Sequence, residues 1–282
     1  MINQFINKLP FADKAIFWTG KFFNRIGNLF LSYKDYKFWQ PHFNRLVRNH
    51  VKVQSDGKLL QYYFNDLNIY SRIYSSDSKV FDLVMLDEEY KAATDIFLLN
   101  NIPLNNCMDL GSNIGLTSLF VKKLFPDCKV VALEPDENNF LMIQKNVEAN
   151  HLTNVHLVKG GVGKRDCFLV DDGGIRNRME WSYSFKEVEE PTGIVSYSIN
   201  TLMKNFSFDE IDFLKIDVEG AEKEIFSDEA DMSFLQKVKV MALEIHDEFN
   251  IRSKIYSILR ENDFIIFNSG ETTIAAKRKL FQ

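Results

Sequence analysis

A strand followed by a glycine-containing turn constrains the fold of this chain more than any other feature. Residues 107–115 read Cys-Met-Asp-Leu-Gly-Ser-Asn-Ile-Gly, which indicates a buried strand that ends at Asp109 and a helix that opens near Gly115. Gly111 and Gly115 let the backbone approach a ligand closely, and the first turn of the helix directs free N–H groups toward it. The sequence therefore predicts a binding site for a small molecule that carries an anionic group.

A second apolar strand, residues 129–133, leads to Glu134. In nucleoside-binding α/β folds, a carboxylate about 20 residues beyond the glycine turn holds the ribose hydroxyls. A dinucleotide fold usually has the spacing G-x-G-x-x-G, whereas Gly111 and Gly115 follow the pattern G-x-x-x-G. Asp109 would repel a pyrophosphate but could orient the ammonium end of a methionine moiety. These features favour S-adenosylmethionine over NAD as the cofactor.

Around this motif, apolar strand patterns alternate with helix patterns, which is typical of a doubly wound α/β sheet. The expected elements are helices at 116–125, 136–150 and 250–261, strands at 154–159, 211–217 and 238–246, and a final hairpin of 264–267 and 272–276. Before the glycine turn, Asp87 is expected to cap a helix that runs through Leu99. Residues 166–199 interrupt the alternation, and we expect a lid or hairpin beside the binding site there; a surface loop without a role is an equal alternative.

The first part of the chain differs in charge from the rest. Residues 1–51 carry eight Lys or Arg and two Asp, a net charge of +6, although the whole chain has a formal charge of −5. We expect an N-terminal extension over residues 1–75, made of a helical arm and a hairpin, and a cofactor-binding domain over residues 76–282. Strand-like runs occur at 61–64 and 79–84.

Residues 14–33 have the pattern of an amphipathic helix, with Lys14, Lys21 and Arg25 on one arc and Trp18 at the boundary between the faces. We expect this helix to pack on the catalytic domain or on a second subunit of a homo-oligomer. The alternative is an arm that lies on an anionic membrane surface.

Composition and patterning disfavour several classes of protein. A net charge of −5 argues against a general affinity for nucleic acid. Cys107, Cys128 and Cys167 are few and far apart, which fits a reduced, cytosolic protein better than a disulfide framework or a zinc site. No apolar run approaches the ~20 residues of a membrane span, and the opening residues lack a cleavable signal pattern. We therefore expect a cytoplasmic protein, either free or bound peripherally at the inner face of the membrane.

Three motifs of this chain occur together. They are residues 109–115, Leu-Glu-Pro at 133–135, and Ile-Asp-Phe-Leu-Lys-Ile-Asp-Val-Glu-Gly-Ala-Glu at 211–222. Together they resemble the FkbM family of S-adenosylmethionine-dependent methyltransferases, over about residues 80–267. The run from Lys215 to Glu222 discriminates most, because a bare D-x-G-x-x-x-G fits most class I methyltransferases.

This resemblance implies a class I, Rossmann-like fold: a seven-stranded, mostly parallel sheet whose last strand is antiparallel. It also implies O-methylation, frequently of sugar hydroxyls on glycans, glycolipids or natural products. Carried over by position, the methionine-side loop would comprise Asp109, Gly111, Ser112, Asn113 and Gly115, Glu134 with Pro135 would hold the ribose, and Gly161 and Val162 would border the adenine.

Polar residues at the ends of the fourth and fifth core strands are the candidates for chemistry. A sugar hydroxyl has a very high pKa and would benefit from a base, for which Asp217, Glu219, Glu244 and His246 are candidates. We expect His246 to be this base and Asp217 to lie beside the methyl group of the cofactor. Lys215 and Asp217 share one face of a strand and could pair.

Each of these residues also has a structural interpretation. Lys215 could merely neutralise Asp217, Glu219 could merely favour the first turn of a helix, and His246 could be a structural hydrogen-bonding group. A divalent cation held by Asp217, Glu244 and His246 is a weaker alternative, and we expect no metal.

The sequence thus predicts an S-adenosylmethionine-dependent O-methyltransferase that acts on a hydroxyl of a sugar, glycan, glycolipid or natural product. We expect the acceptor to bind between His246 and residues 171–191. Two alternatives remain open. One is a catalytically silent, methyltransferase-like adaptor in a membrane-associated glycan assembly complex, and the other is a nucleotide-dependent oxidoreductase, which the glycine spacing disfavours.

Overall fold

The chain divides into two units, Met1–Asp87 and Glu88–Gln282. The computed structural model describes residues 33–73, 75–175, 183–188 and 194–281. The helix predicted over residues 14–33 lies outside the described residues except for its last position. Among the helices that the structure describes, none is long and apolar enough to cross a lipid bilayer.

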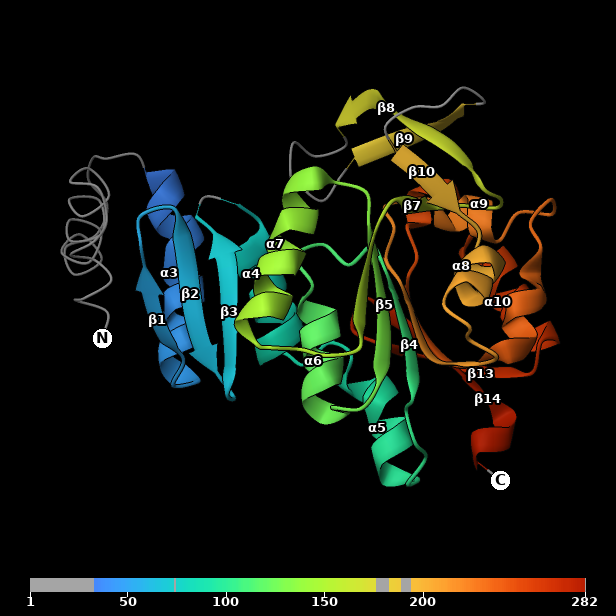
Figure 1. The fold of residues 1–282 in the computed structure, drawn as a ribbon, viewed down its shortest axis with the longest axis horizontal. Coiled ribbons are helices and arrows are strands. Elements are labelled where there is room, and N and C mark those ends of the chain that lie inside the picture. The colour runs from blue at the N-terminus through green and yellow to red at the C-terminus, as the bar shows by residue number, and fades with distance from the viewer. Residues whose placement is uncertain (1–32, 74, 176–182, 189–193, 282) are drawn as a thin grey trace. The chain divides into compact units, whose positions relative to one another are not determined.

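The described part of the first unit combines helices with a small antiparallel sheet, drawn in blue and cyan in Figure 1. The sheet has the strand order β1-β2-β3, and helices precede and follow it. The elements are α3 (Tyr33–Arg48), β1 (Lys52–Ser55), β2 (Leu59–Phe64), β3 (Leu67–Arg72), α4 (Asp77–Phe81) and the π-helical turn η1 (Asp82–Leu86). The predicted run at 61–64 is confirmed as a strand, within β2.

The strand predicted at residues 79–84 is wrong, because these residues belong to α4 and η1. A short apolar run suits a buried helix as well as a strand, and here tertiary contacts decide. Phe81 is fully buried and stacks on Tyr62 of β2 with ring centroids 4.1 Å apart. The Asp77 carboxylate, in the first turn of α4, accepts hydrogen bonds from the Arg72 backbone N–H and guanidinium.

The cap predicted for the next helix is also wrong. Helix α5 (Lys91–Leu99) begins four residues after Asp87, and no side chain caps it. Asp87 instead follows η1 directly, and its carboxylate pairs with Arg45. Asp87 therefore ends one element, whereas the next acid, Glu88, pairs with Lys91 at the start of α5.

The second unit is built on a seven-stranded sheet with the order β13-β14-β12-β11-β4-β5-β6. The strands from β12 to β6 are parallel, and β14 is antiparallel to both of its neighbours. The fold class predicted from the sequence is thereby confirmed. The strands are β4 (Asn106–Leu110), β5 (Lys129–Glu134), β6 (Val155–Lys159), β11 (Ile211–Ile216), β12 (Val238–Glu244), β13 (Phe264–Ser269) and β14 (Thr272–Lys277).

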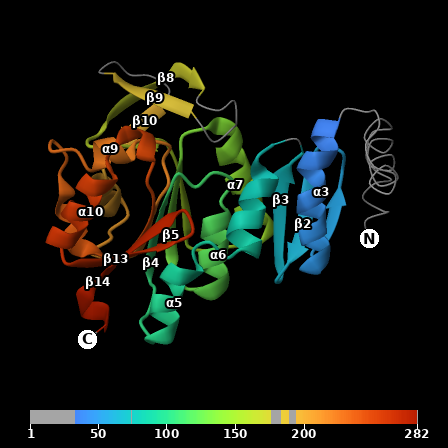
Figure 2. The ribbon, with the colours of Figure 1, turned by 180° about the vertical axis from the view of Figure 1, so that it is seen from behind.

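Helices cover both faces of this sheet. Helices α6 and α7 pack on β4, β5 and β6 at one face, and α8 and α10 lie at the other face (Figure 1, and from behind in Figure 2). The helices of the unit after α5 are α6 (Leu116–Leu124), α7 (Glu137–Ala149), α8 (Ile199–Asn205), α9 (Glu222–Ile225) and α10 (Arg252–Glu261), with short turns η2 (Met232–Lys237), η3 (Asp247–Phe249) and η4 (Arg278–Phe281).

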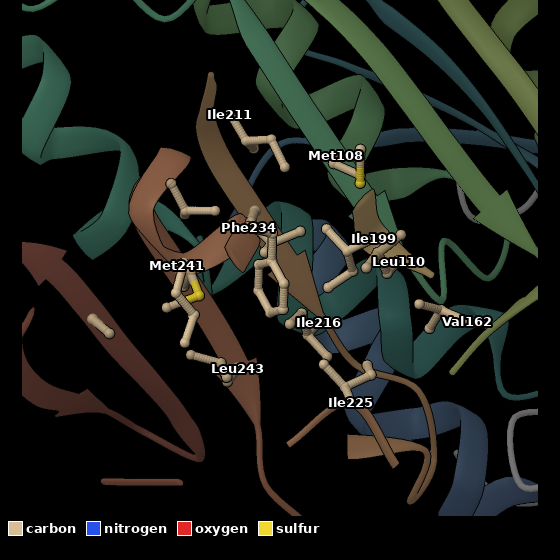
Figure 3. Packing of buried hydrophobic residues seen from close by; sticks show 14 of the residues in the cluster. Met108, Leu110, Val162, Ile199, Ile211, Ile216, Ile225, Phe234, Met241 and Leu243 are labelled. Atoms are coloured by element: carbon tan, nitrogen blue, oxygen red, sulfur yellow. The ribbon is translucent and has the colours of Figure 1, made fainter. Parts of the chain in front are cut away.

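An apolar cluster fills the space between the sheet and α8, η2 and α10. Met108 and Leu110 of β4, Ile216 of β11 and Leu243 of β12 all point into it, together with Phe234 of η2 (Figure 3). Each such side chain contributes on the order of 1.5–3 kcal/mol when it leaves water. This burial fixes which face of each strand turns inward.

The same burial pattern gathers charged residues on the opposite face. Side chains alternate along a strand, so Asp109, between Met108 and Leu110, points away from the cluster. Alternation puts Lys215, Asp217 and Glu244 on that face as well, and Lys215 stands directly opposite Asp109 in the β4–β11 ladder. The strand order reverses between β4 and β11, and such a switch point is where open α/β sheets bind ligands.

Residues 166–199 form most of a second sheet with the order β7-β10-β8-β9. Strands β8 and β9 are antiparallel to each other. Strand β10 pairs with β8 and also with β7, which follows β6 directly in the chain. The strands are β7 (Gly161–Val162), β8 (Cys167–Ile175), β9 (Tyr183–Val188) and β10 (Ile194–Tyr197). Residues 176–182 and 189–193 of the predicted lid lie outside the described residues.

Candidate active site

The turn after β4 is held against the exit of β11 too closely for any side chain. Gly111 has φ +76°, and a Cβ placed on it would lie 1.8 Å from the Asp217 carbonyl oxygen. The Asp217 N–H donates to the Leu110 carbonyl at 3.1 Å. Gly115 also has a positive φ, +85°, and directly precedes α6. At Gly111, only glycine combines a positive φ with so close a backbone contact, and at Gly115 the positive φ favours glycine.

Ser112 and Asn113 shape the turn from within. The Ser112 hydroxyl donates to the carbonyl of Asp109 at 2.7 Å and lies 3.1 Å from that of Leu133, so it serves the backbone. The Asn113 N–H donates to Glu134 Oε2 at 2.8 Å. Among the described residues, Asn113 Oδ1 is buried and has no hydrogen-bond partner. An orphaned acceptor in a ligand-binding turn fits a ligand N–H or O–H group.

Glu134 ends β5 beside this turn, where the sequence places the ribose ligand. Besides Asn113, its carboxyl accepts from the Asp136 N–H at 3.0 Å and the Asn139 amide at 3.3 Å. Burial raises the pKa of Glu134 to about 7, although these hydrogen bonds oppose the shift. The adjoining Pro135 is partly buried.

A buried ion cluster lies beneath the turn. Lys215 Nζ donates to the Gly111 carbonyl at 2.6 Å and lies 3.3 Å from Asp217 Oδ2 and 3.6 Å from Asp109 Oδ1. The predicted pairing of Lys215 with Asp217 is thereby confirmed. Burial opposes the ammonium charge, but the pKa of Lys215 is still raised well above its usual value, chiefly by Asp217 and also by Tyr90 and Asp109. Lys215 therefore ties the turn to β11 as a permanent cation.

Asp109 is fully buried rather than open to the front of the turn. Ser118 of α6 donates to its Oδ2 at 2.7 Å, whereas Oδ1 has no hydrogen-bond partner in the described part of the chain. A direct contact with a ligand ammonium would need this unpartnered oxygen. The structure otherwise explains Asp109 as the counter-charge of Lys215.

His246 is clamped between two carboxylates just after β12. Its Nδ1 lies 2.6 Å from Glu222 Oε1 and its Nε2 lies 3.3 Å from Glu219 Oε2. Burial disfavours the charged ring, but hydrogen bonds with Glu219 and Glu222 outweigh it and raise the pKa of His246 to about 11. Both ring nitrogens are occupied and the imidazole keeps its proton at neutral pH, so the geometry does not favour His246 as the base expected from the sequence.

Glu244 is the carboxyl whose environment suits a base. It ends β12 and is half-buried, and it pairs in the ladder with Thr272 of β14. Asp217 and burial raise the pKa of Glu244 to about 8, and Glu219 and Glu89 add to this while His246 opposes it. A base that titrates near neutral pH combines availability with proton affinity.

Three residues that the sequence interpretation passed over also belong to this site. The Thr272 hydroxyl donates to Glu89 Oε1 at 2.9 Å, and burial raises the pKa of Glu89. Tyr90 is buried within electrostatic reach of Lys215 and Asp217, and burial raises its pKa well above the usual value. Glu89 precedes Thr272 by 183 positions, so no local pattern could have joined them.

Three non-glycine residues in the loops of the site have positive φ angles: Glu88, Asn113 and Glu219, at 51°, 51° and 49°. Asparagine tolerates this region, but glutamate rarely adopts it. Nine other described non-glycine residues outside the site also have positive φ angles, so backbone strain does not single out the site.

The structure gives packing reasons for the two residues expected at the adenine. A Cβ on Gly161 would lie 2.6 Å from Leu169 Cδ1 of β8, and Val162 is buried in the apolar cluster. The preceding residue, Gly160, donates its N–H to the Glu134 carbonyl at 3.1 Å. Strand β7 therefore begins next to the predicted ribose ligand.

Two of the three residues considered as metal ligands, Asp217 and His246, form ion pairs with other side chains. Among the described residues, no group of three or more His, Cys, Asp or Glu is arranged to hold a metal ion. His246, in particular, contacts Glu219 and Glu222 through its two nitrogens.

Comparison with known proteins gives one family. The model described as "Methyltransferase FkbM domain" matches residues 109–266. The chain is 23% identical over 138 residues to Methyltransferase 1 of Beauveria bassiana (strain ARSEF 2860), a match to 42% of this chain and 55% of that protein. It is 24% identical over 204 residues to Methyltransferase sdnD of Sordaria araneosa, a match to 59% of this chain and 76% of that protein.

Among solved structures, the precorrin-6y C5,15-methyltransferase from Geobacter metallireducens GS-15 aligns with a TM-score of 0.39 and 14% identity, over 66% of this chain and 87% of that chain. The match to the family model runs from Asp109, at the glycine turn, through β11 and β12 into the last hairpin. It includes more than half of the chain and the carboxyl ends of β4, β5, β11 and β12. The chain is therefore a member of the FkbM family of methyltransferases.

Proposed function

We propose that this methyltransferase transfers a methyl group from S-adenosylmethionine to a hydroxyl of a sugar, glycan, glycolipid or natural product. The observation that carries the proposal is the raised pKa of Glu244. This half-buried carboxyl is repelled by Asp217, and its pKa is raised to about 8. A hydroxyl nucleophile must lose a proton during the reaction, and general bases contribute most for such nucleophiles. A carboxyl group whose pKa lies near neutral pH can accept this proton and release it later.

The residues around the turn fit the methyl donor. Gly111 lets the turn close on β11, where a Cβ would collide with the Asp217 carbonyl oxygen, and Asn113 Oδ1 is a buried acceptor without a hydrogen-bond partner among the described residues. Glu134 would accept hydrogen bonds from the ribose hydroxyls. When bound, the donor supplies a methyl group activated by a positive sulfur. This chain's residues then supply alignment, which can account for much of the rate of an in-line transfer.

Glu244, rather than His246, takes the role of base in this proposal. Glu244 would accept the hydroxyl proton, and Asp217 would lie beside the transferred methyl group. His246 would act as a positioning residue, because its charge holds Glu219 and Glu222 in place and lowers the pKa of Glu244.

The reaction class is tested by incubation with methyl-labelled S-adenosylmethionine and a glycan and metabolite extract from the protein's own source. We expect label in a methyl ether, identified after hydrolysis and mass spectrometry. Label on nitrogen or carbon would refute O-methylation. Donor binding by calorimetry without any transfer would instead favour the adaptor.

The variant Glu244→Gln should lower kcat by about 10²- to 10⁴-fold, the usual contribution of a general base, with little change in the affinity for the neutral demethylated product. At donor concentrations well below KM, the wild-type rate should rise with pH through about 8, because the rate then depends on the ionisation of Glu244 in the free enzyme. Steady-state rates from pH 6 to 9 on the identified acceptor check both statements. Glu261→Gln, an exposed carboxyl in α10, is the matched control. An unchanged pH profile in Glu244→Gln would place the base elsewhere.

Glu134 gives a second pH dependence, in binding. Its ionised form accepts hydrogen bonds best, so donor affinity should rise with pH through about 7 and fall as acid protonates it. The effect of Glu134 on stability has the opposite sign. Because its pKa is higher in the folded than in the unfolded state, protonated Glu134 stabilises the fold fully at pH values below the unfolded-state pKa. This stabilisation is lost as pH rises through about 7. Calorimetry and thermal unfolding of Glu134→Gln, compared with the wild type from pH 5.5 to 8, should show both slopes reduced. Slopes equal to those of the wild type would remove Glu134 from the donor site.

A further inference from the structure

The strand ends that form the site carry more acids than bases. Lys215 contacts Asp109 and Asp217, and His246 contacts Glu219 and Glu222, so each cation already faces two carboxyl groups. Among the described residues, Glu244 and Glu89 add two further carboxyl groups that form no ion pair. The site therefore has an excess of negative charge before any ligand arrives. Its carboxyl groups are Glu89, Asp109, Asp217, Glu219, Glu222 and Glu244, and its cations are Lys215 and His246.

Two buried carboxylate oxygens of this site also lack hydrogen bonds. Among the described residues, Glu222 Oε2 has no hydrogen-bond partner, and Asp109 Oδ1 has none either, although it lies 3.6 Å from Lys215 Nζ. Buried polar atoms are normally paired, and an unpaired one carries a desolvation cost. An acid-rich site with a buried carboxylate oxygen that lacks a hydrogen bond favours the binding of a positively charged group.

The raised pKa of Glu244 reflects this excess of negative charge. Its carboxyl faces Asp217 at the end of β11, Glu219 before α9, Glu89 before α5, and His246 on its own segment, and the repulsion from Asp217 contributes most to its raised pKa. Asp217 is also the residue whose backbone closes on Gly111 in the donor-binding turn. A positive charge within about 4–6 Å of a carboxyl lowers its pKa by about 1–3 units.

We propose that Glu244 loses its proton to solvent when the cationic methyl donor binds and that it stays protonated beside the neutral, demethylated product. This inference rests on the proposed function. Glu244 would thus become a base only while the donor is present.

The charge balance of a full turnover follows. Donor binding brings one positive charge and releases one proton from Glu244 to the buffer. During transfer, the carbon–sulfur bond breaks as the carbon–oxygen bond forms, the sulfur becomes neutral, and Glu244 takes the hydroxyl proton. The site returns to its original charge with product bound, so the next donor again has to displace a proton.

Proton release on binding tests the proposal directly. Calorimetric titrations with S-adenosylmethionine and with S-adenosylhomocysteine, at pH 7.5 in two buffers of different ionisation enthalpy, give the number of protons released by each ligand. We expect S-adenosylmethionine to release about half to one proton more than S-adenosylhomocysteine. Glu134 contributes equally to both titrations because both ligands carry the ribose.

The difference in proton release should vanish in Glu244→Gln and persist in Glu261→Gln. The wild type offers a second measurement that needs no variant. From pH 6 to 8, the preference for S-adenosylmethionine over S-adenosylhomocysteine should rise by up to about tenfold per pH unit, by linkage.

Equal proton release by the two bound ligands, with a preference that does not change with pH, would overturn the proposal and leave the proposed function standing. A difference that persists undiminished in Glu244→Gln would assign the proton to another carboxyl and would also overturn it. Failure of both ligands to bind would overturn the proposed function itself.

Discussion

Alanine in place of Gly111 should reduce donor affinity by about 100-fold or more, since displacements near 1 Å at a positioned site can have effects of that size. The added Cβ would lie 1.8 Å from the Asp217 carbonyl oxygen, so β4 and β11 could not keep their present separation at this point. The positive φ of +76° adds a conformational cost of roughly 1–2 kcal/mol for alanine. Calorimetry with S-adenosylhomocysteine and thermal unfolding measure the two effects.

The variant Gly57→Ala separates the collision from the backbone cost. Gly57, in the first unit, has φ +94°, but a Cβ there would have no heavy atom within 4 Å. Gly57→Ala should therefore lower stability slightly and leave donor affinity unchanged. If Gly111→Ala binds the donor as tightly as Gly57→Ala does, the turn at Gly111 is not the donor site.

Replacing Lys215 by methionine should lower the free energy of unfolding by roughly 3–5 kcal/mol, the usual loss when one partner of a buried ion pair is removed. Asp109 is fully buried and Lys215 supplies the ammonium that faces it. Methionine preserves much of the side-chain volume, so the loss comes mainly from the uncompensated carboxylate. Denaturant unfolding followed by circular dichroism measures the change.

A second substitution identifies the cause. Asp109→Asn removes the buried charge, so the double variant Asp109→Asn/Lys215→Met should recover a large part of the stability lost in Lys215→Met. Asp217 is 27% exposed at its side chain and can be solvated without Lys215. A double variant as unstable as the sum of its two single variants would show that the ion cluster is not the reason for the loss.

The sheet and the glycine turn could be predicted because each rests on a local pattern. Residues 211–216 are buried at every position, as a central parallel strand requires, and four of the six are apolar in the sequence. Gly111 and Gly115 likewise stand where the backbone needs positive φ angles. The pairing of Lys215 with Asp217 followed from the period of two along a strand.

The rest depended on contacts between distant segments. Residues 79–84 became helical because Phe81 stacks on Tyr62, a contact that their own composition does not reveal. The sequence predicts that His246 is a base, but in the structure its Nδ1 contacts Glu222 of α9. Glu222 belongs to the family motif, but the direction of its side chain depends on the four-residue helix α9, which begins at Glu222.

The hydrogen bond from Lys215 to Gly111 joins residues 104 positions apart in the chain. A growing polypeptide that has emerged only as far as β6 contains the whole glycine motif and Glu134, but it lacks the strand that presses the turn into shape. Contacts of such separation form late, because a long loop must close first. Methyl donor in the cell should therefore stabilise only chains that have already docked β11, and donor binding becomes a signature of completed folding.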